Sequence, residues 1–183
     1  RGKINEFNRV LRGDLTTSYE GVSSFSHELT VLLKTIRFVV TLDVDTQLPR
    51  DSVRKMVGTI LHPLNQPVFD SKLGRVTQGY GILQPRIGVS LESSTRSIFA
   101  KLFSGYTGID PYTTAVSDVY QDLFHEGSYT GKGLYEVDAF EAALSERVPE
   151  NTVLSHDLFE GLYTRVGLLS DVELLDDYPK TYF

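Results

Sequence analysis

The sequence predicts an α/β domain built on a mostly parallel sheet that is flanked by helices. Residues 36–42, IRFVVTL, are nearly all apolar and rich in Val and Ile, which is typical of a strand buried on both faces of a parallel sheet. Helical patterns alternate with strand patterns along the rest of the chain, as in other α/β proteins. The 183 residues, 40% of them hydrophobic, suit one domain with its own core.

The first helices follow from apolar spacing and from residues that begin or end a helix. Residues 3–12 place their apolar side chains on one helical face, and Gly13 ends that helix. A second helix follows Asp51, a residue type that caps helices, and ends before Pro63. Further helices are expected over residues 111–124, 137–147 and 155–167.

The remaining segments are assigned in the same way. The last helix begins at Ser155, a capping residue, and ends at Gly167. Residues 28–34 fit either helix or strand. Strands are expected over 75–91 and 168–175, and the acidic residues 171–179 are expected to form a solvated strand edge, which weighs against a second metal site.

Composition excludes several function classes. The net charge is −6 with no basic patch, which argues against nucleic-acid binding. The absence of cysteine excludes disulfides and thiolate chemistry. No apolar run approaches the roughly 18 residues of a membrane span, and no signal peptide is visible. The chain opens with RGKINEF and closes with YPKTYF, so we expect it to be a piece of a longer protein.

Two aspartates, Asp43 and Asp45, follow the apolar run at once. Ligands of open α/β sheets bind beyond the carboxyl ends of strands, and a divalent cation bridging to phosphate would offset the cost of placing two acids there. Nucleotide-sugar glycosyltransferases use such a D-x-D pair. Haloacid-dehalogenase-like phosphatases use D-x-D-x-T with a nucleophilic first Asp, but Gln47 stands at the Thr position here. Simple capping of the following turn is the third interpretation.

The second half holds two further candidates. Gly131, Lys132 and Gly133 do not form a phosphate-binding P-loop, because the glycine spacing is wrong and no Ser or Thr follows the lysine. Taken alone they indicate a flexible turn before the next helix. Asp157, after His156 at a helix start, is most simply a capping or first-turn acid. Tyr129 and Tyr135 are expected in the core or at its rim.

In order, these segments resemble a known family. The phrases TLDVDTQLPRD, GILQPRIGVSL, PYTTAVSDVYQDLFHEGSYTGKGLYEVDAFEAAL and PENTVLSHDLFEG are similar to the glycosyltransferase domain of cyclic β-1,2-glucan synthases, which are inverting, family 2-type enzymes. The resemblance covers residues 1–183. It implies a GT-A-like fold, with the whole chain forming the catalytic core of a glycosyltransferase.

The resemblance also implies substrates and residue roles. The donor would be UDP-glucose, the acceptor a growing β-1,2-glucan, and the cofactor Mg²⁺ or Mn²⁺. Asp45 would be the main metal ligand, Asp43 would lie near the uridine diphosphate, and Asp157 would be the catalytic base. Lys3, within a segment that also contains Gly2 and Asn8, would bind the nucleotide. The expected acceptor-binding residues are Gln84, Gly131, Lys132, Gly133 and His156.

The match departs from the family pattern in places. His156 replaces the Glu of the T-E-D-type motif, which leaves the role of that position open. A first nucleotide-binding strand is expected before residue 1 and a Q-x-x-R-W motif after residue 183, so we expect the chain without them to bind donor poorly or not to turn over. The resemblance places the site at the cytoplasmic face of the bacterial inner membrane, within a larger membrane-embedded synthase. A phosphatase and a non-catalytic saccharide-binding segment remain the alternatives.

Overall fold

A computed structural model describes residues 2–90, 95, 97–103, 119–145, 147 and 156–177. Within this part of the chain, five strands form one mixed sheet in the order β1–β6–β5–β7–β2. The strands are β1 (Phe38–Thr41), β6 (Gly133–Glu136), β5 (Ile82–Val89), β7 (Val166–Asp176) and β2 (Thr46–Gln47). A separate antiparallel hairpin consists of β3 (Val68–Asp70) and β4 (Arg75–Gln78).

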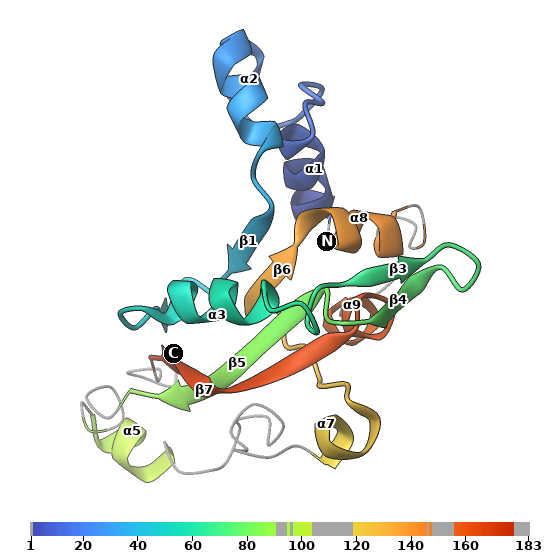
Figure 1. The fold of residues 1–183 in the computed structure, drawn as a ribbon. Helices are drawn as coiled ribbons and strands as arrows, with labels where there is room; N and C mark the ends of the chain where they lie inside the picture. Colours follow the sequence, from blue (N-terminus) through green and yellow to red (C-terminus); the bar gives the residue numbers. More distant parts are fainter. Residues whose placement is uncertain are drawn as a thin grey trace.

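The described helices are α1 (Gly2–Leu11), α2 (His27–Lys34), α3 (Ser52–Ile60), α5 (Ile98–Phe103), α7 (Val119–Phe124), α8 (Val137–Leu144) and α9 (Asp157–Thr164), with a short 3₁₀ turn at Val22–Ser24. Helices α3 and α8 pack on opposite faces of the sheet, whereas α2 stands away from it at the top of the view (Figure 1). The side chains of Leu11 from α1 and Phe140 from α8 join one buried cluster on the sheet. Met56 and Ile60 from α3 join a second cluster.

The central strands contribute to both clusters because successive side chains of a strand point to opposite faces. In β5, Ile82 belongs to the cluster with α1 and α8, whereas Leu83 belongs to the cluster with α3. In β6, Tyr135 and Leu134 divide in the same way. The chain therefore forms an α/β/α arrangement, which confirms the α/β class; Tyr135 lies in the core, as predicted.

The prediction of a mostly parallel sheet is wrong. Only β5 and β7 pair in parallel among the described strands, whereas β1–β6, β6–β5 and β7–β2 are antiparallel. The apolar run of residues 36–42 is typical of a strand in a parallel sheet, and its residues do pack on both clusters. Such a run indicates that both faces of the sheet are covered by helices. It does not indicate the direction of the strand, which depends on how the strands are connected.

Several predicted helices form with shifted ends. Helix α3 begins at Ser52, but the Asp51 side chain does not cap it; Asp51 has φ of 68° and its carboxylate pairs with Arg54. Helix α9 ends at Thr164 because Arg165 turns into a left-handed conformation with φ of 57°. Gly167, expected to end that helix, is already part of β7. Ser155 and residues 111–118 lie outside the described residues.

Strand β6 was not predicted, because its first residue belongs to the glycine pair interpreted as a flexible turn. Gly133 has φ of +156°, and a Cβ there would lie 2.3 Å from the carbonyl oxygen of Leu83. Only glycine allows the two backbones to approach this closely. The loop of residues 131–133 is therefore tied to the centre of the sheet.

Replacing Gly133 by Ala should lower the free energy of unfolding by about 1–3 kcal/mol or more, because backbone strain and the collision with Leu83 act together. The measurement is urea unfolding monitored by circular dichroism. Gly58→Ala is the matched control, since a Cβ in that helix meets nothing within 4 Å; it should raise stability by about 0.5–1 kcal/mol. Equal effects of the two substitutions would contradict the close approach at Gly133.

Candidate functional site

The two aspartates of the D-x-D pair lie in the turn between β1 and β2. The carbonyl oxygen of Asp43 accepts a hydrogen bond from the Thr46 amide at 3.1 Å, and that of Asp45 accepts one from the Asp177 amide at 3.1 Å. Both residues are exposed. The backbone of the turn is thus fixed at two points, while both residues remain exposed to solvent, where a ligand can reach them.

Lys132 lies against this turn from the loop before β6. Its ammonium group is 3.0 Å from the Asp43 carboxylate and also contacts the Asp176 carboxylate at the end of β7. The Lys132 side chain is 13% exposed. Burial alone would lower the pKa of Lys132, but the hydrogen bonds from its ammonium group to Asp176 and Asp43 outweigh burial and raise it. Lys132 therefore stays positively charged between two acids.

Sequence reasoning missed Asp176 as a site residue. Its second carboxylate oxygen accepts a hydrogen bond from the Thr46 hydroxyl at 2.6 Å, so Asp176 joins β7 to the D-x-D turn. Residues 171–179 were predicted to form a solvated strand edge, and Asp171 and Glu173 are exposed. The prediction is wrong at Leu175 and Asp176, because β2 pairs with β7 there; residues 178–179 lie outside the described residues. The available signal was the place of Asp176 at the carboxyl end of a strand, where ligands of α/β sheets bind.

Asp157 reaches the same region from the first turn of α9. A Cβ placed on Gly131 would lie 3.3 Å from both carboxylate oxygens of Asp157, and Gly131 itself has φ of +88°. Burial raises the pKa of Asp157, and the negative charge of Asp43 raises it further, while His156 acts in the opposite direction. The two acids, which are distant in sequence, thus share one site.

The buried side of the site is held by Tyr129 and Gln84. The Tyr129 hydroxyl lies 2.9 Å from the Thr41 hydroxyl at the end of β1, and burial raises the pKa of Tyr129 although that hydrogen bond lowers it. Gln84 is fully buried. It donates to the Pro85 carbonyl at 2.8 Å and accepts from the Thr130 amide at 3.0 Å. In this structure Gln84 fixes the start of the loop; an acceptor-binding role stays a prediction.

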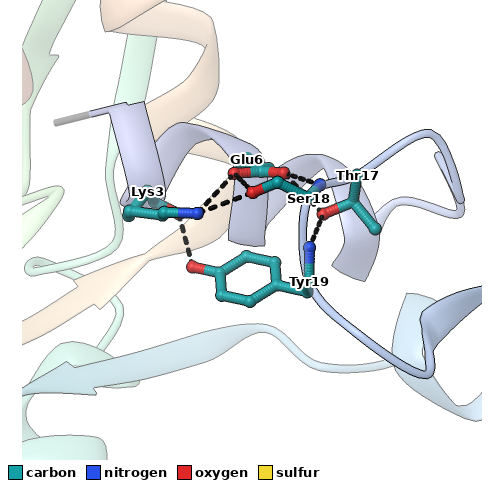
Figure 2. Close-up of polar contacts among 5 residues, drawn as sticks. All are labelled: Lys3, Glu6, Thr17, Ser18 and Tyr19. Atoms are coloured by element: carbon teal, nitrogen blue, oxygen red, sulfur yellow. Dashed lines mark hydrogen bonds and ion pairs between the residues drawn. The ribbon is translucent and has the colours of Figure 1, made fainter.

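The structure does not bring Lys3 to these residues. Lys3 belongs to an exposed cluster at α1, where its ammonium group donates to the Ser18 hydroxyl at 2.6 Å and lies 3.5 Å from Glu6 (Figure 2). The Tyr19 hydroxyl donates to the Lys3 carbonyl at 3.0 Å. Asn8, from the same predicted nucleotide-binding segment, is buried and bonded to Glu141 and Tyr135. A nucleotide-binding role of this segment stays a prediction.

The cluster of Figure 2 has its own measurable property. The Glu6 carboxylate accepts hydrogen bonds from the Ser18 amide and from the Thr17 hydroxyl at 2.7 Å. These bonds lower the pKa of Glu6 from 4.5 to about 2. A carboxyl group with a lowered pKa stabilises the fold above its unfolded-state pKa and loses that effect as the pH falls through its folded-state pKa.

Glu6→Gln should therefore lower the melting temperature at pH 7, and the difference from the wild type should shrink as the pH falls from about 4.5 to about 2. Thermal unfolding at several pH values measures both effects. Glu20→Gln, at an exposed position, is the control and should show neither. A difference between wild type and Glu6→Gln that does not depend on pH would contradict the hydrogen-bonded carboxylate.

The donor atoms near the D-x-D turn suit a metal that is shared with a substrate. Among the described residues, no three His, Asp or Glu side chains form a group that could hold a metal. Asp43 and Asp45 offer exposed carboxylate oxygens, the ligand type that Mg²⁺ and Mn²⁺ prefer. Mg²⁺ usually binds through one or two carboxylates together with substrate phosphates. The residues present fit such a site.

No protein-family model matches the chain. The chain is 50% identical over all 183 of its residues to the cyclic beta-(1,2)-glucan synthase NdvB of Rhizobium meliloti strain 1021. It spans 6% of the length of that relative. Within the described residues, no helix has both the length and the apolar character needed to cross a membrane. The chain is therefore similar, over its whole length, to a small part of a cyclic beta-(1,2)-glucan synthase.

Proposed function

We propose that this chain is the catalytic core of an inverting glucosyltransferase that transfers glucose from UDP-glucose to a growing β-1,2-glucan. The observation that carries the proposal is the shared site of Asp157 and the D-x-D turn, in which the charge of Asp43 raises the pKa of Asp157. One partly buried acid thus lies beside an exposed acidic turn. An inverting transfer needs both a catalytic base and a binding site for the nucleotide of the donor, and these two features would supply them.

Asp157 acts as the base. Its carboxylate accepts the proton of an acceptor glucose hydroxyl, expected at the 2-position, as that oxygen forms a bond to the anomeric carbon of the donor. The bond from the anomeric carbon to the diphosphate breaks on the opposite face, and its electron pair leaves with UDP. Burial and the neighbouring Asp43 raise the pKa of Asp157, which makes its carboxylate a stronger base than an exposed aspartate.

The D-x-D turn receives the donor. Asp45 and Asp43 would hold the divalent metal and the nucleotide; the metal, when bound, neutralises charge on the departing diphosphate. The turn itself is fixed through the hydrogen bonds of Asp43 and Asp45 to Thr46 and Asp177. Little rearrangement of the backbone is then needed when the donor arrives.

We also propose that the chain works within a longer synthase. The relative that it matches is many times longer, since the chain spans 6% of it. The family resemblance further implies that this synthase is embedded in a membrane and that its transfer site faces the cytoplasm. The D-x-D turn and Asp157 would then receive donor from the cytoplasm and extend a glucan held by other parts of the protein.

The test is glucose transfer by the full-length protein that contains this chain. It is incubated with UDP-glucose, Mn²⁺ and a β-1,2-linked oligoglucoside, and UDP release is followed together with the length of the oligosaccharide. Release of UDP with a lengthened product supports the proposal. Phosphate release from a phosphomonoester without transfer would favour the phosphatase, and glucan binding without UDP binding would favour a non-catalytic saccharide-binding segment.

A further inference from the structure

We propose that Lys132 is a positioning residue of the donor site: it holds Asp43 in place, is anchored by Asp176, and does not contact the acceptor. This inference rests on the proposed function and deepens it. The ammonium group of Lys132 lies 3.0 Å from the Asp43 carboxylate and in direct contact with that of Asp176. Asp43 belongs to the turn that we propose receives the donor, and Asp176 is hydrogen-bonded to Thr46 at the end of that turn.

The three side chains differ in how far they are exposed to solvent. The Lys132 side chain is 13% exposed and that of Asp176 is 24% exposed, whereas that of Asp43 is 62% exposed. Asp176 is further held by the hydroxyl of Thr46. The Lys132–Asp176 pair is therefore the more buried, anchored part of this cluster. The exposed carboxylate of Asp43 depends on its ion pair with Lys132 to keep its orientation.

Charge balance makes this attachment necessary. Asp43 and Asp176 both contact Lys132, so removing its charge would leave two carboxylates near each other with no cation between them. The Lys132–Asp176 pair is largely buried, and removing one partner of such a pair commonly costs more than the pair contributes, because the remaining charge is unpaired. The contact with the exposed Asp43 is screened by solvent and contributes less. Asp43, as the exposed member, would turn toward solvent and away from the nucleotide.

The residues on either side of Lys132 connect it to the rest of the site. A Cβ added to Gly131 would lie 3.3 Å from the carboxylate oxygens of Asp157, and one added to Gly133 would lie 2.3 Å from the Leu83 carbonyl oxygen. Lys132, between them, reaches the D-x-D turn. The loop of residues 131–133 therefore lies close to Asp157, continues into strand β6 at Gly133 and contacts the D-x-D turn through Lys132. We infer that this loop sets the position of Asp43 relative to Asp157.

The test measures donor and acceptor constants separately in the full-length protein. Lys132→Met should raise the KM for UDP-glucose by about tenfold or more, with the acceptor KM nearly unchanged. Lys132→Arg should restore most of the donor affinity because it keeps the charge. Lys72→Met, which removes an exposed lysine in the β3–β4 turn, is the control and should match the wild type.

Adding Asp176→Asn to Lys132→Met should recover part of the donor affinity, since one of the two unpaired carboxylates becomes neutral. A rise of the acceptor KM with an unchanged donor KM would overturn the inference and support acceptor contact by Lys132. Wild-type constants in Lys132→Met would also overturn it. If Lys132→Met fails to fold, Asp176→Asn alone takes its place and should give a smaller rise of the donor KM.

Failure of the proposed function would be seen separately, as absence of transfer by the wild type. The pairing is then tested by thermal unfolding of wild type, Lys132→Met, Asp43→Asn and the double variant. Non-additive shifts of the melting temperature between Lys132 and Asp43 support the attachment. Additive shifts would overturn it, whatever reaction the site performs.

Discussion

Replacing Asp157 by Asn is expected to lower glucose transfer from UDP-glucose by about 10²–10⁴-fold, the usual contribution of a general base. Asn keeps the size of the side chain next to Gly131 but cannot take the proton of the acceptor hydroxyl. UDP binding should stay close to the wild-type value, because the D-x-D turn is held by other residues. The loss should appear in kcat.

Single-turnover transfer and titration calorimetry with UDP measure the two quantities. Asp171→Asn, an exposed aspartate on β7, provides a matched control and should behave like the wild type. Near-normal transfer by Asp157→Asn would show that another group is the base. Loss of both transfer and UDP binding would point to a structural role of Asp157 at the start of α9.

The pH profile gives a second measurement of the same assignment. Burial and then the charge of Asp43 raise the pKa of Asp157 above the ordinary 3.8. The base is active when ionised, so kcat/KM should fall as the pH decreases through this raised pKa. Asp43→Asn removes one cause and should move the acidic limb to lower pH. If the acidic limb of the pH profile does not move in Asp43→Asn, the group that titrates there is not Asp157.

The sequence contains enough information for most helices but not for the direction of the strands. Helices α1, α8 and α9 form close to the segments that were predicted to be helical, with ends that differ by up to three residues. The strand at 38–41 forms as well, yet it runs antiparallel to β6. Local pattern reports which faces are buried, whereas strand order and direction depend on contacts between distant segments, such as Val39 opposite Tyr135.

The site shows the same division between local and distant information. The Asp pair stands out because two acids interrupt an apolar run, and that signal is local. Asp176 gives no such signal, since its part in the site depends on Lys132 and Thr46, which approach it only in the fold. Tyr129 is similar: its hydroxyl bonds to Thr41 across a long stretch of chain.

Asp45→Ala is expected to abolish the metal-dependent part of UDP binding. The carboxylate of Asp45 is exposed in the D-x-D turn, while its backbone carbonyl accepts a hydrogen bond from the Asp177 amide. Alanine keeps this backbone bond, so the turn should stay in place and only the oxygen ligand is lost. The Kd for UDP in Mn²⁺ should rise by at least the roughly 10–100-fold that even outer partners of metal sites contribute.

Removal of the metal separates a ligand from a residue that merely contacts the nucleotide. In the wild type, EDTA should weaken UDP binding to the level of Asp45→Ala, because either change removes the same metal-bridged contact. In Asp45→Ala, EDTA should have no further effect. Asp171→Ala should keep the full response to EDTA. A metal response of wild-type size in Asp45→Ala would instead assign the metal to Asp43, and the ion pair between Lys132 and Asp43 would then have to open before the donor binds.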